Sequence, residues 1–228
     1  MKKISVIQSN YIPWKGYFDI INASDLFIFY DDVQFTKNDW RNRNKLKTKN
    51  GISWISIPCG CAIHRLVNEV TLEDDSWQRS HWDKIKQSYV KAKYFQYYKG
   101  FFEDIYLGRR WSNLSEFNQY LTKEICKLLH ITTQFDDSRN YTLRGSQNDR
   151  LLDLLQQVGA SEYISGPTAK AYLNEKSFSD ANIGLTFFDY TNYPVYQQLF
   201  PPFVHEVSII DLLFNEGPTA SKYMKSFV

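Results

Sequence analysis

The sequence predicts an α/β fold with a mostly parallel sheet and flanking helices. Two continuous apolar runs, residues 4–7 and 26–30, read as buried strands, and a helix-like segment that begins at Trp14 lies between them. Strands that are apolar throughout are typical of a parallel sheet with both faces covered, and a helix between two strands connects them in parallel. From residue 74 onward the apolar spacing becomes helical, which predicts further helices.

The remaining elements follow from apolar periodicity and turn residues. Strands are expected at residues 4–7, 26–30, 54–58, 163–165 and 185–190. Helices are expected at residues 14–21, 78–92, 95–106, 113–129, 149–158, 169–174 and 208–215. The chain contains no internal repeat or flexible linker, so we expect one α/β domain over residues 1–228, with a mainly helical insertion at about 74–130.

Composition excludes several classes of protein. The 228 residues are 43% hydrophobic and 23% charged, so the chain can bury a core and is not intrinsically disordered. A net charge of +2 gives no reason to expect a nucleic-acid partner. Apolar runs are too short for a membrane span, and the first is too short for a signal peptide. Three cysteines, an odd number, favour a reducing, cytoplasmic location.

Familiar catalytic motifs are missing from the sequence. It contains no G-x-S-x-G, Walker A, G-x-G-x-x-G or H-E-x-x-H motif, which argues against common serine hydrolases, P-loop enzymes and zinc proteases. Cys59 and Cys61 are spaced too closely for the usual zinc pairs, so no protein-bound metal centre is predicted. Function therefore has to be argued from clusters of polar residues.

Three polar clusters directly follow predicted strands. They span residues 8–17, 31–49 and 165–170. Ligands of open parallel sheets bind beyond the carboxyl ends of the strands, where the loops that follow those strands meet. We therefore expect the three clusters to form one cleft.

The second cluster carries a row of cations at alternate positions, namely Arg41, Arg43, Lys45, Lys47 and Lys49. In an extended chain these side chains project from one face, about 6.6 Å apart. Arginine forks hold phosphate oxygens with two hydrogen bonds, so we expect Arg41 and Arg43 to bind a diphosphate. For the three lysines we prefer the interpretation of a solvated edge strand, because lysines commonly protect exposed edges.

Candidate catalytic residues lie in the second cluster and in a predicted helix. Asp31 and Asp32 end a buried strand, where carboxylates could hold Mg²⁺ or sugar hydroxyls, or accept a proton. Lys37 follows them in the same cluster. His81 lies between two tryptophans at helical spacing. Histidine is the usual acid–base group at neutral pH, although a single helical histidine is more often structural.

The third cluster offers another anion-binding feature, at the junction of a strand with a predicted helix. Free backbone N–H groups, two hydroxyls and Lys170 could cradle a phosphate there, and an ordinary N-cap explains the same residues equally well. Asp189, at the end of a later strand, is expected to join the cleft. The candidate substrate-binding residues are Gln8, Asn10, Tyr11, Trp14, Tyr17, Asp39, Trp40, Arg41, Asn42, Arg43, Ser165, Gly166, Thr168, Lys170 and Asp189.

Several segments resemble the WbqC-like family. They are residues 7–19 (IQSNYIPWKGYFD), 30–35 (YDDVQF), 37–43 (KNDWRNR), 163–173 (YISGPTAKAYL), 188–190 (FDY) and 208–218 (SIIDLLFNEGP). The sequence departs from the family at Ser9, where the family usually has Pro. The resemblance implies a cytoplasmic role in bacterial O-antigen or other surface-polysaccharide biosynthesis, on nucleotide-linked sugars that are often amino sugars. It implies a pathway and leaves the reaction open.

A more distant likeness is to adenylate-forming nucleotidyltransferases. Residues 13–17 (PWKGY) open a helix after the first strand, and residues 164–170 (ISGPTAK) follow a later strand, in a similar layout. This likeness implies a Rossmann-like topology. Trp14 and Tyr17 stand where that family has the histidines of its His-x-Gly-His motif, so the likeness does not extend to nucleotidyl transfer itself.

Three functions stay open. The first is a transferase, or an ATP-dependent amide ligase, that acylates or aminoacylates the amino group of a nucleotide-linked sugar. Arg41 and Arg43 would then hold the diphosphate, and His81 or Asp31 would accept the amine proton. An acyl-CoA or a folate could supply the acyl group, or ATP with Mg²⁺ could activate a carboxylate as an acyl adenylate. The other functions are a nucleotidyltransferase with a rebuilt active site and a non-catalytic binding protein of the polysaccharide machinery. The sequence leaves the oligomeric state open.

Overall fold

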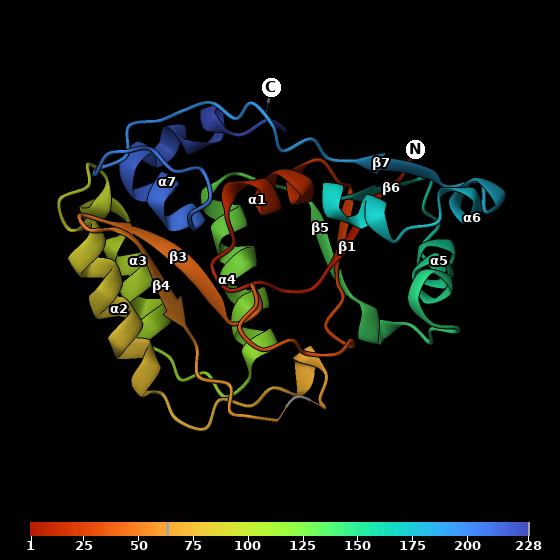
Figure 1. Ribbon diagram of the computed structural model, residues 1–228, viewed down its shortest axis with the longest axis horizontal. Helices are drawn as coiled ribbons and strands as arrows, with labels where there is room; N and C mark the ends of the chain where they lie inside the picture. The colour runs from red at the N-terminus through yellow and green to blue at the C-terminus, as the bar shows by residue number, and fades with distance from the viewer. Residues whose placement is uncertain (63, 228) are drawn as a thin grey trace.

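The computed structural model describes residues 1–62 and 64–227, and its centre is a five-stranded parallel sheet (Figure 1). The strands are β1 (Lys3–Ile7), β2 (Leu26–Phe29), β5 (Gln134–Asp137), β6 (Glu162–Ser165) and β7 (Gly184–Phe187). Their order is β5-β2-β1-β6-β7, and each neighbouring pair is parallel. The first strand is therefore central, and the chain winds outward to one edge and then to the other, as in Rossmann-like folds.

Helices surround this sheet and form a second group beside it. The α-helices are α1 (Lys15–Asn22), α2 (Ser76–Tyr89), α3 (Phe95–Leu107), α4 (Leu114–Leu128), α5 (Gln147–Gln157), α6 (Glu175–Asp180) and α7 (Ile209–Glu216). Short 3-10 helices cover Val67–Glu69, Ser138–Asn140, Pro167–Ala171 and Gly217–Tyr223. Within the described part of the chain, none of the helices has the length and apolar character needed to cross a membrane.

Each face of the sheet has its own apolar cluster. In β2, Phe27 and Phe29 belong to the cluster that contains the apolar sides of α1 and α4, whereas Leu26 and Ile28 belong to the cluster of α5. Successive side chains of a strand point to opposite faces, so a strand covered on both sides must be apolar throughout. This double burial is the physical reason for the continuous apolar runs in the sequence.

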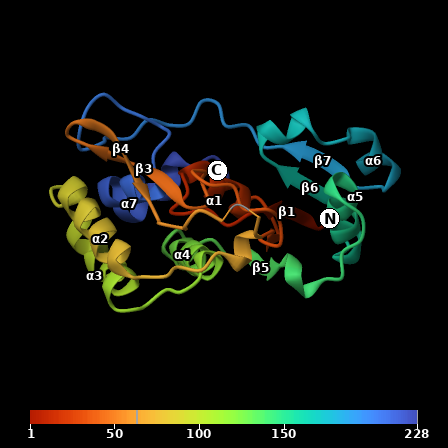
Figure 2. The ribbon, with the colours of Figure 1, turned by 60° about the horizontal axis from the view of Figure 1, so that its bottom comes forward.

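The larger cluster extends beyond the sheet into a second group of elements. The antiparallel hairpin of β3 (Arg43–Thr48) and β4 (Gly51–Ser56) packs against α2 and α7, and α3 covers α2 (Figure 2). Leu46 and Ile55 point into the cluster, whereas Trp54 on the opposite face of the hairpin is exposed. Most aromatic side chains of the protein belong to this larger cluster or pack against it. Phe214 of α7, for example, packs between rings of α2 and α3.

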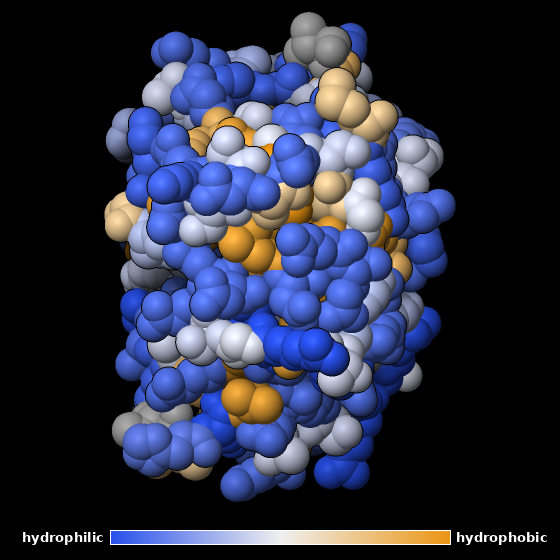
Figure 3. Space-filling view, turned by 90° about the vertical axis from the view of Figure 1, so that its right-hand side faces the viewer, coloured by the Kyte–Doolittle hydropathy of each residue, from blue (hydrophilic) through white to orange (hydrophobic). Residues whose placement is uncertain are grey.

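The face that carries α5 and α6 differs in character. In Figure 3 it is largely hydrophilic, and its apolar atoms form small separate groups. Small scattered apolar groups are normal on a protein surface and do not by themselves indicate an interface.

Most predicted elements are confirmed, with a few differences. The helix expected at 169–174 is wrong: a 3-10 helix covers Pro167–Ala171, and α6 begins only at Glu175. The last strand ends at Phe187 and not at residue 190. β5 escaped prediction because its sequence, Gln-Phe-Asp-Asp, is mostly polar and lies at an edge of the sheet. β3 is extended, as the cation row suggested, but pairs in its own hairpin. The expectation of a solvated edge strand is wrong for Lys47, which is buried because the Pro202 carbonyl accepts a hydrogen bond from its Nζ atom (2.6 Å).

Candidate functional site

A cavity opens at the carboxyl edge of the sheet. β1 and β6 lie side by side, but the chain runs from β1 to β2 on one side and from β6 to β7 on the other. A crevice forms beyond the ends of two such strands, and ligands of open α/β sheets bind there. Here a cavity of about 580 Å³ is lined by Asn10 from the loop after β1 and by Thr168 from the segment after β6. This volume is in the usual range for small-molecule sites.

The wall of this cavity combines aromatic rings with a few polar groups. Its lining residues are Asn10, Pro13, Trp14, Trp40, Asn44, Thr168, Tyr190, Asn192, Tyr193, His205 and Glu206. Four of the predicted binding residues, Asn10, Trp14, Trp40 and Thr168, are among them. Apolar rings with a small number of placed polar groups are typical of sites that bind a ligand by shape and orient it by hydrogen bonds.

Trp14 forms much of the aromatic wall. The centre of its ring lies 4.8 Å from that of Tyr190 and 5.6 Å from that of Tyr193, both in edge-to-face geometry. A Cβ atom on Gly16 would approach the Trp14 ring to 2.3 Å. Glycine at this position therefore allows the indole to fold back over the start of α1, where it faces the cavity.

The loop after β1 is held in an unusual conformation. Ile12 has φ of 36°, a left-handed value that is strained for a β-branched residue. The Nδ2 atom of Asn44 donates to the carbonyl oxygens of Tyr11 (2.9 Å) and Ile12 (3.0 Å), and the Tyr11 N–H donates to the Trp40 carbonyl (2.9 Å). The hairpin thus fixes the loop that presents Asn10 to the cavity.

His205 is a lining residue that the sequence reasoning did not select. Its ring packs edge-on against Phe203, with 4.6 Å between ring centres, and its Nδ1 atom is buried without a hydrogen-bond partner in the described chain. Burial and the positive charge of Lys15 lower the pKa of His205, so its imidazole is neutral at pH 7. In the sequence, His205 lies far from the three polar clusters, in an irregular segment whose apolar spacing has no period that could have indicated its position.

Lys15 lies behind the aromatic wall and is only 2% exposed. Its Nζ atom donates to the Pro194 carbonyl (3.1 Å) and lies 4.7 Å from the centre of the Tyr193 ring. Among the described residues no carboxylate oxygen is within 4 Å of this ammonium group. Burial lowers the pKa of Lys15 to about 8. A buried ammonium without an ion-pair partner within 4 Å is costly.

Asp19 anchors the same wall from inside α1. Its Oδ2 atom accepts hydrogen bonds from the Tyr193 hydroxyl (2.5 Å) and the Lys225 N–H (3.1 Å), and its Oδ1 atom accepts from the Ser226 N–H (2.9 Å). One fully buried carboxylate therefore connects α1, the segment after β7 and residues near the C-terminus.

The structure places Asp31 and Asp32 outside the cavity lining. Asp31 is fully buried: Oδ1 accepts from the Ser9 N–H (2.7 Å), and Oδ2 accepts from Ser115 and from Gln119 (3.0 Å). Asp32 pairs with Arg150 and accepts from Ser138. Asp31 does not line the cavity, and its bond to the Ser9 N–H holds the loop after β1.

His81 and Lys37 also lie away from the cavity. His81 is buried, with Nδ1 2.7 Å from the Tyr11 hydroxyl and Nε2 3.2 Å from the Ser56 carbonyl. Desolvation lowers the pKa of His81 to about 4. Lys37 is exposed, and its Nζ atom is 4.0 Å from the Cys61 sulfur. The structure therefore does not bring the four predicted catalytic side chains together, and their catalytic roles stay predictions.

Two tyrosines and a glutamine of the first cluster support the fold around the site. The Tyr11 hydroxyl bonds to His81 and, at 2.8 Å, to Tyr106. The Tyr17 hydroxyl donates to the Gln8 carbonyl (3.0 Å), which closes the end of β1. Tyr11 and Tyr17 are buried and do not line the cavity.

In the second cluster, some polar side chains have hydrogen-bond or ion-pair partners and others do not. Asp39 forms an ion pair with Arg41, and Asn42 donates to the Ile57 carbonyl (3.0 Å). Arg43 lies over the Trp54 ring, 4.4 Å from its centre, and no carboxylate of the described chain pairs with it. Arg43 is therefore a cation without an ion-pair partner in the described chain, and the Trp54 ring that it covers lies 5.5 Å from the ring of Trp40, which lines the cavity.

The third cluster contributes one lining residue. Thr168 reaches the cavity, whereas the Ser165 hydroxyl is buried and donates to Tyr163 (3.3 Å). Gly166 precedes the 3-10 helix, and Lys170 is exposed. Asp189 accepts from Thr191 and from Lys225 Nζ (2.9 Å). Hydrogen bonding by the Thr191 N–H is the main reason that the pKa of Asp189 falls to about 2.

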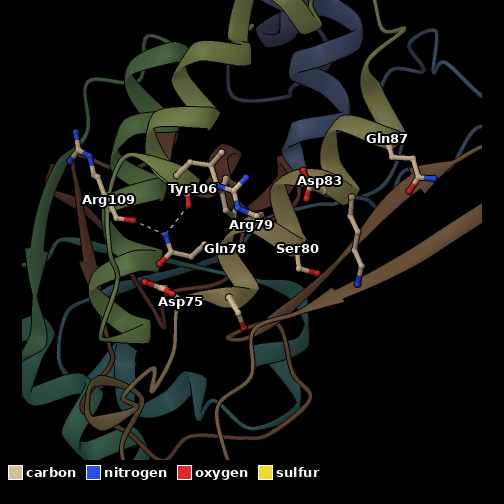
Figure 4. Close-up of a pocket in the computed structure, with 11 residues that line it drawn as sticks. Asp75, Gln78, Arg79, Ser80, Asp83, Gln87, Tyr106 and Arg109 are labelled. Atoms are coloured by element: carbon tan, nitrogen blue, oxygen red, sulfur yellow. Dashed lines mark hydrogen bonds between the residues drawn. The ribbon is translucent and has the colours of Figure 1, made fainter.

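A larger cavity of about 720 Å³ lies between α2 and the end of α3 (Figure 4). Gln78 closes its floor by donating to the carbonyls of Tyr106 (2.9 Å) and Arg109 (2.7 Å). The charged side chains around it are surface groups, and Arg109 is already paired with Asp104 at 3.2 Å. It lies away from the strand ends, so we place the functional site in the smaller cavity. No group of three or more His, Cys, Asp or Glu in residues 1–62 and 64–227 is arranged to hold a metal ion.

Comparison with known proteins agrees with the resemblance noted in the sequence. The model of the WbqC-like protein family matches residues 8–223. A protein of Mycobacterium tuberculosis (strain ATCC 25618 / H37Rv), named "Uncharacterized protein Rv1507c", is 42% identical over 227 residues, which are 99% of this chain and 98% of that protein. No solved structure matches the chain. The chain therefore belongs to the WbqC-like protein family.

Proposed function

We propose that the protein binds a nucleotide-linked amino sugar in the aromatic cavity and acylates or aminoacylates its amino group, in the cytoplasmic stage of bacterial surface-polysaccharide (O-antigen) biosynthesis. The observation that carries this proposal is the cavity beyond β1 and β6, with Trp14, Tyr190 and Tyr193 on one wall. Aromatic rings stack on the apolar faces of sugars, and the amides of Asn10 and Asn192 can hydrogen-bond sugar hydroxyls.

The charges around the cavity suit a diphosphate-linked substrate. Arg43 has no ion-pair partner among the described residues and lies over the Trp54 ring, which neighbours that of Trp40. Lys45 lies 5.7 Å from the centre of the Trp40 ring and is paired with Glu206, so it would bind phosphate by exchanging that partner. Arg41 is paired with Asp39, so it would bind phosphate only by exchanging that partner. A diphosphate held at this rim would direct the attached sugar into the cavity.

The reaction requires a neutral amine and a group that takes its proton. His205 is the imidazole that lines the cavity, and its lowered pKa keeps it unprotonated at pH 7. Asp31 and His81, the acceptors expected from the sequence, are engaged elsewhere in this structure. The amine nitrogen would attack the acyl carbonyl of an activated donor, such as a thioester or an acyl adenylate, and form the amide C–N bond. The C–S bond of the thioester, or the C–O bond of the adenylate, would break and release the thiolate or AMP, and His205 would receive the proton that the nitrogen loses.

A binding and turnover experiment tests this proposal. UDP-, dTDP- and GDP-linked amino sugars are added to the protein, the melting temperature is recorded, and products are sought by mass spectrometry with acetyl-CoA, a formyl folate, or ATP with amino acids. A ligand at ~100 times its Kd stabilises by roughly 2.7 kcal/mol, which raises Tm by several degrees. Trp14→Ala should abolish this shift, whereas Tyr97→Ala, which removes an aromatic ring that is 69% exposed on α3, should not. No shift with any sugar nucleotide refutes the proposal.

The strand order favours one second candidate, a nucleotidyltransferase with a rebuilt site, because Rossmann-like sheets bind nucleotides at this edge. Its imidazole would come from His205 and not from the start of α1, where Trp14 and Tyr17 stand. Exchange of labelled pyrophosphate into ATP or another nucleoside triphosphate would identify this activity. Sugar-nucleotide binding without turnover or exchange would instead favour a non-catalytic binding protein of the same pathway.

A further inference from the structure

The outer face of the β3–β4 hairpin carries an aromatic pair that the fold does not cover. Trp40 is 43% exposed and Trp54 is 41% exposed, with 5.5 Å between their ring centres and 32° between their planes. Each tryptophan could bury much more apolar area if the core were its only role. Their exposure leaves ring surface available for a planar ligand.

Two cations lie against this pair. The guanidinium carbon of Arg43 is 4.4 Å from the centre of the Trp54 ring, and Lys45, directly across the hairpin from Trp54, has its Nζ atom 5.4 Å from that ring. In the part of the chain described here, the Arg43 guanidinium has no carboxylate partner, and its Nε is buried without a hydrogen bond. A stacked and unpaired arginine is suited to bind an anion next to the rings.

This face and the cavity share a rim. Trp40 belongs to both, and Lys45 pairs at 3.3 Å with Glu206, which lines the cavity. A ligand that begins on Trp54 can therefore pass the two cations and enter the cavity beside Trp40. The order of chemistry along this path is an aromatic surface, then positive charge, then a pocket of rings and amides.

A nucleotide-linked sugar has the same order: a base, a diphosphate and a sugar. We propose that Trp54 and Trp40 form the subsite for its nucleobase, that Arg43 and Lys45 bind its diphosphate, and that the cavity receives the sugar. This inference rests on the proposed function and adds the position of the nucleotide. Stacking requires only the flat face of a base, so the subsite accepts uracil, thymine and guanine alike. Selectivity then comes from the cavity, through the sugar.

The test separates the nucleotide from the sugar. Binding of UDP-glucosamine and of glucosamine 1-phosphate, which lacks the nucleoside, is measured by calorimetry for the wild type, Trp54→Ala, Trp54→Phe and Arg43→Gln. Ile52→Ala is the matched control, because Ile52 lies on the same outer face, is 39% exposed and has no cation stacked on it. Circular dichroism and melting temperature establish that each variant is folded.

We expect Trp54→Ala to weaken UDP-glucosamine by roughly 5- to 100-fold, the range for loss of a base–aromatic stack, and to leave glucosamine 1-phosphate unchanged. Trp54→Phe restores most of the affinity, Arg43→Gln weakens both ligands, and Ile52→Ala changes neither. Equal losses for both ligands in Trp54→Ala, or no loss, overturn the subsite while the proposed function stands. If the wild type binds no sugar nucleotide or sugar phosphate, both proposals fail.

Discussion

Lys15 should reduce the stability of the protein at neutral pH, and replacing it with methionine should therefore stabilise the fold. The side chain is buried, and its pKa falls to about 8 in the folded protein, against ~10.4 for a lysine in the unfolded chain. A difference of about 2.4 pKa units corresponds to roughly 3.3 kcal/mol that the folded state loses while Lys15 is charged. Methionine has a similar length and no charge.

The way the unfolding free energy changes with pH tests whether Lys15 destabilises the fold. Because the folded pKa is the lower one, the unfolded chain binds more protons between about pH 8 and 10.5, and Lys15 makes stability rise with pH in that window. The advantage of Lys15→Met over the wild type should therefore shrink by about 1–2 kcal/mol between pH 6.5 and 9.5. Other titrating groups cancel in this difference, because both proteins contain them.

Urea unfolding at the two pH values measures this effect. The control is Lys91→Met, which removes an exposed lysine and should give a pH-independent difference near zero. The reasoning is refuted if Lys15→Met is no more stable than the wild type at pH 6.5, or if its advantage is the same at pH 9.5. A stable variant also allows a functional comparison, since the positive charge behind the Tyr193 ring would be gone.

Three further outcomes are expected. Asp31→Asn should lower the unfolding free energy by about 2–4 kcal/mol. The buried carboxylate accepts hydrogen bonds from several donors, and in the variant an amide NH₂, itself a donor, would face some of them. Unchanged stability with lost turnover would make Asp31 catalytic instead. Gly16→Ala should push the Trp14 ring out of place, reducing sugar-nucleotide affinity and costing about 1–3 kcal/mol in urea unfolding; wild-type affinity would contradict the placement of Trp14. For His81, whose folded pKa of about 4 lies below its unfolded value, stability should fall by up to about 3 kcal/mol as pH drops from 6.5 to 4, and His81→Gln should lose less; parallel pH profiles would show that His81 is not buried in neutral form.

The parallel sheet was the predictable part of the fold, because double burial leaves a direct signal in β1 and β2. β5 leaves no such signal, since its polar residues pair with β2 only at the edge of the sheet. The same limit explains the segment after Ser165. Its apolar spacing fits a helix, but the chain forms a 3-10 helix, breaks, and restarts at Glu175. Backbone pairing and helix breaks of this kind depend on tertiary neighbours.

The position of the cavity was also predictable, whereas the direction of the side chains around it was not. The loops after β1 and β6 do meet at one cavity, as parallel topology requires. Asp31 lies at the expected strand end but points inward to Ser9 and Gln119, a choice that depends on α4. His205 reaches the cavity from a segment without periodicity, so only the folded structure could reveal it.

Nearly half of the cavity lining comes from one irregular stretch, residues 188–206, which supplies Tyr190, Asn192, Tyr193, His205 and Glu206. This stretch contains no helix or strand, and the anchors described above hold it by Asp19 and Lys225. Substitutions there can reshape the pocket without disturbing the sheet or the two apolar clusters. The architecture therefore gives relatives a simple route to new ligand preferences: they can diverge in this single stretch and retain the scaffold that presents it.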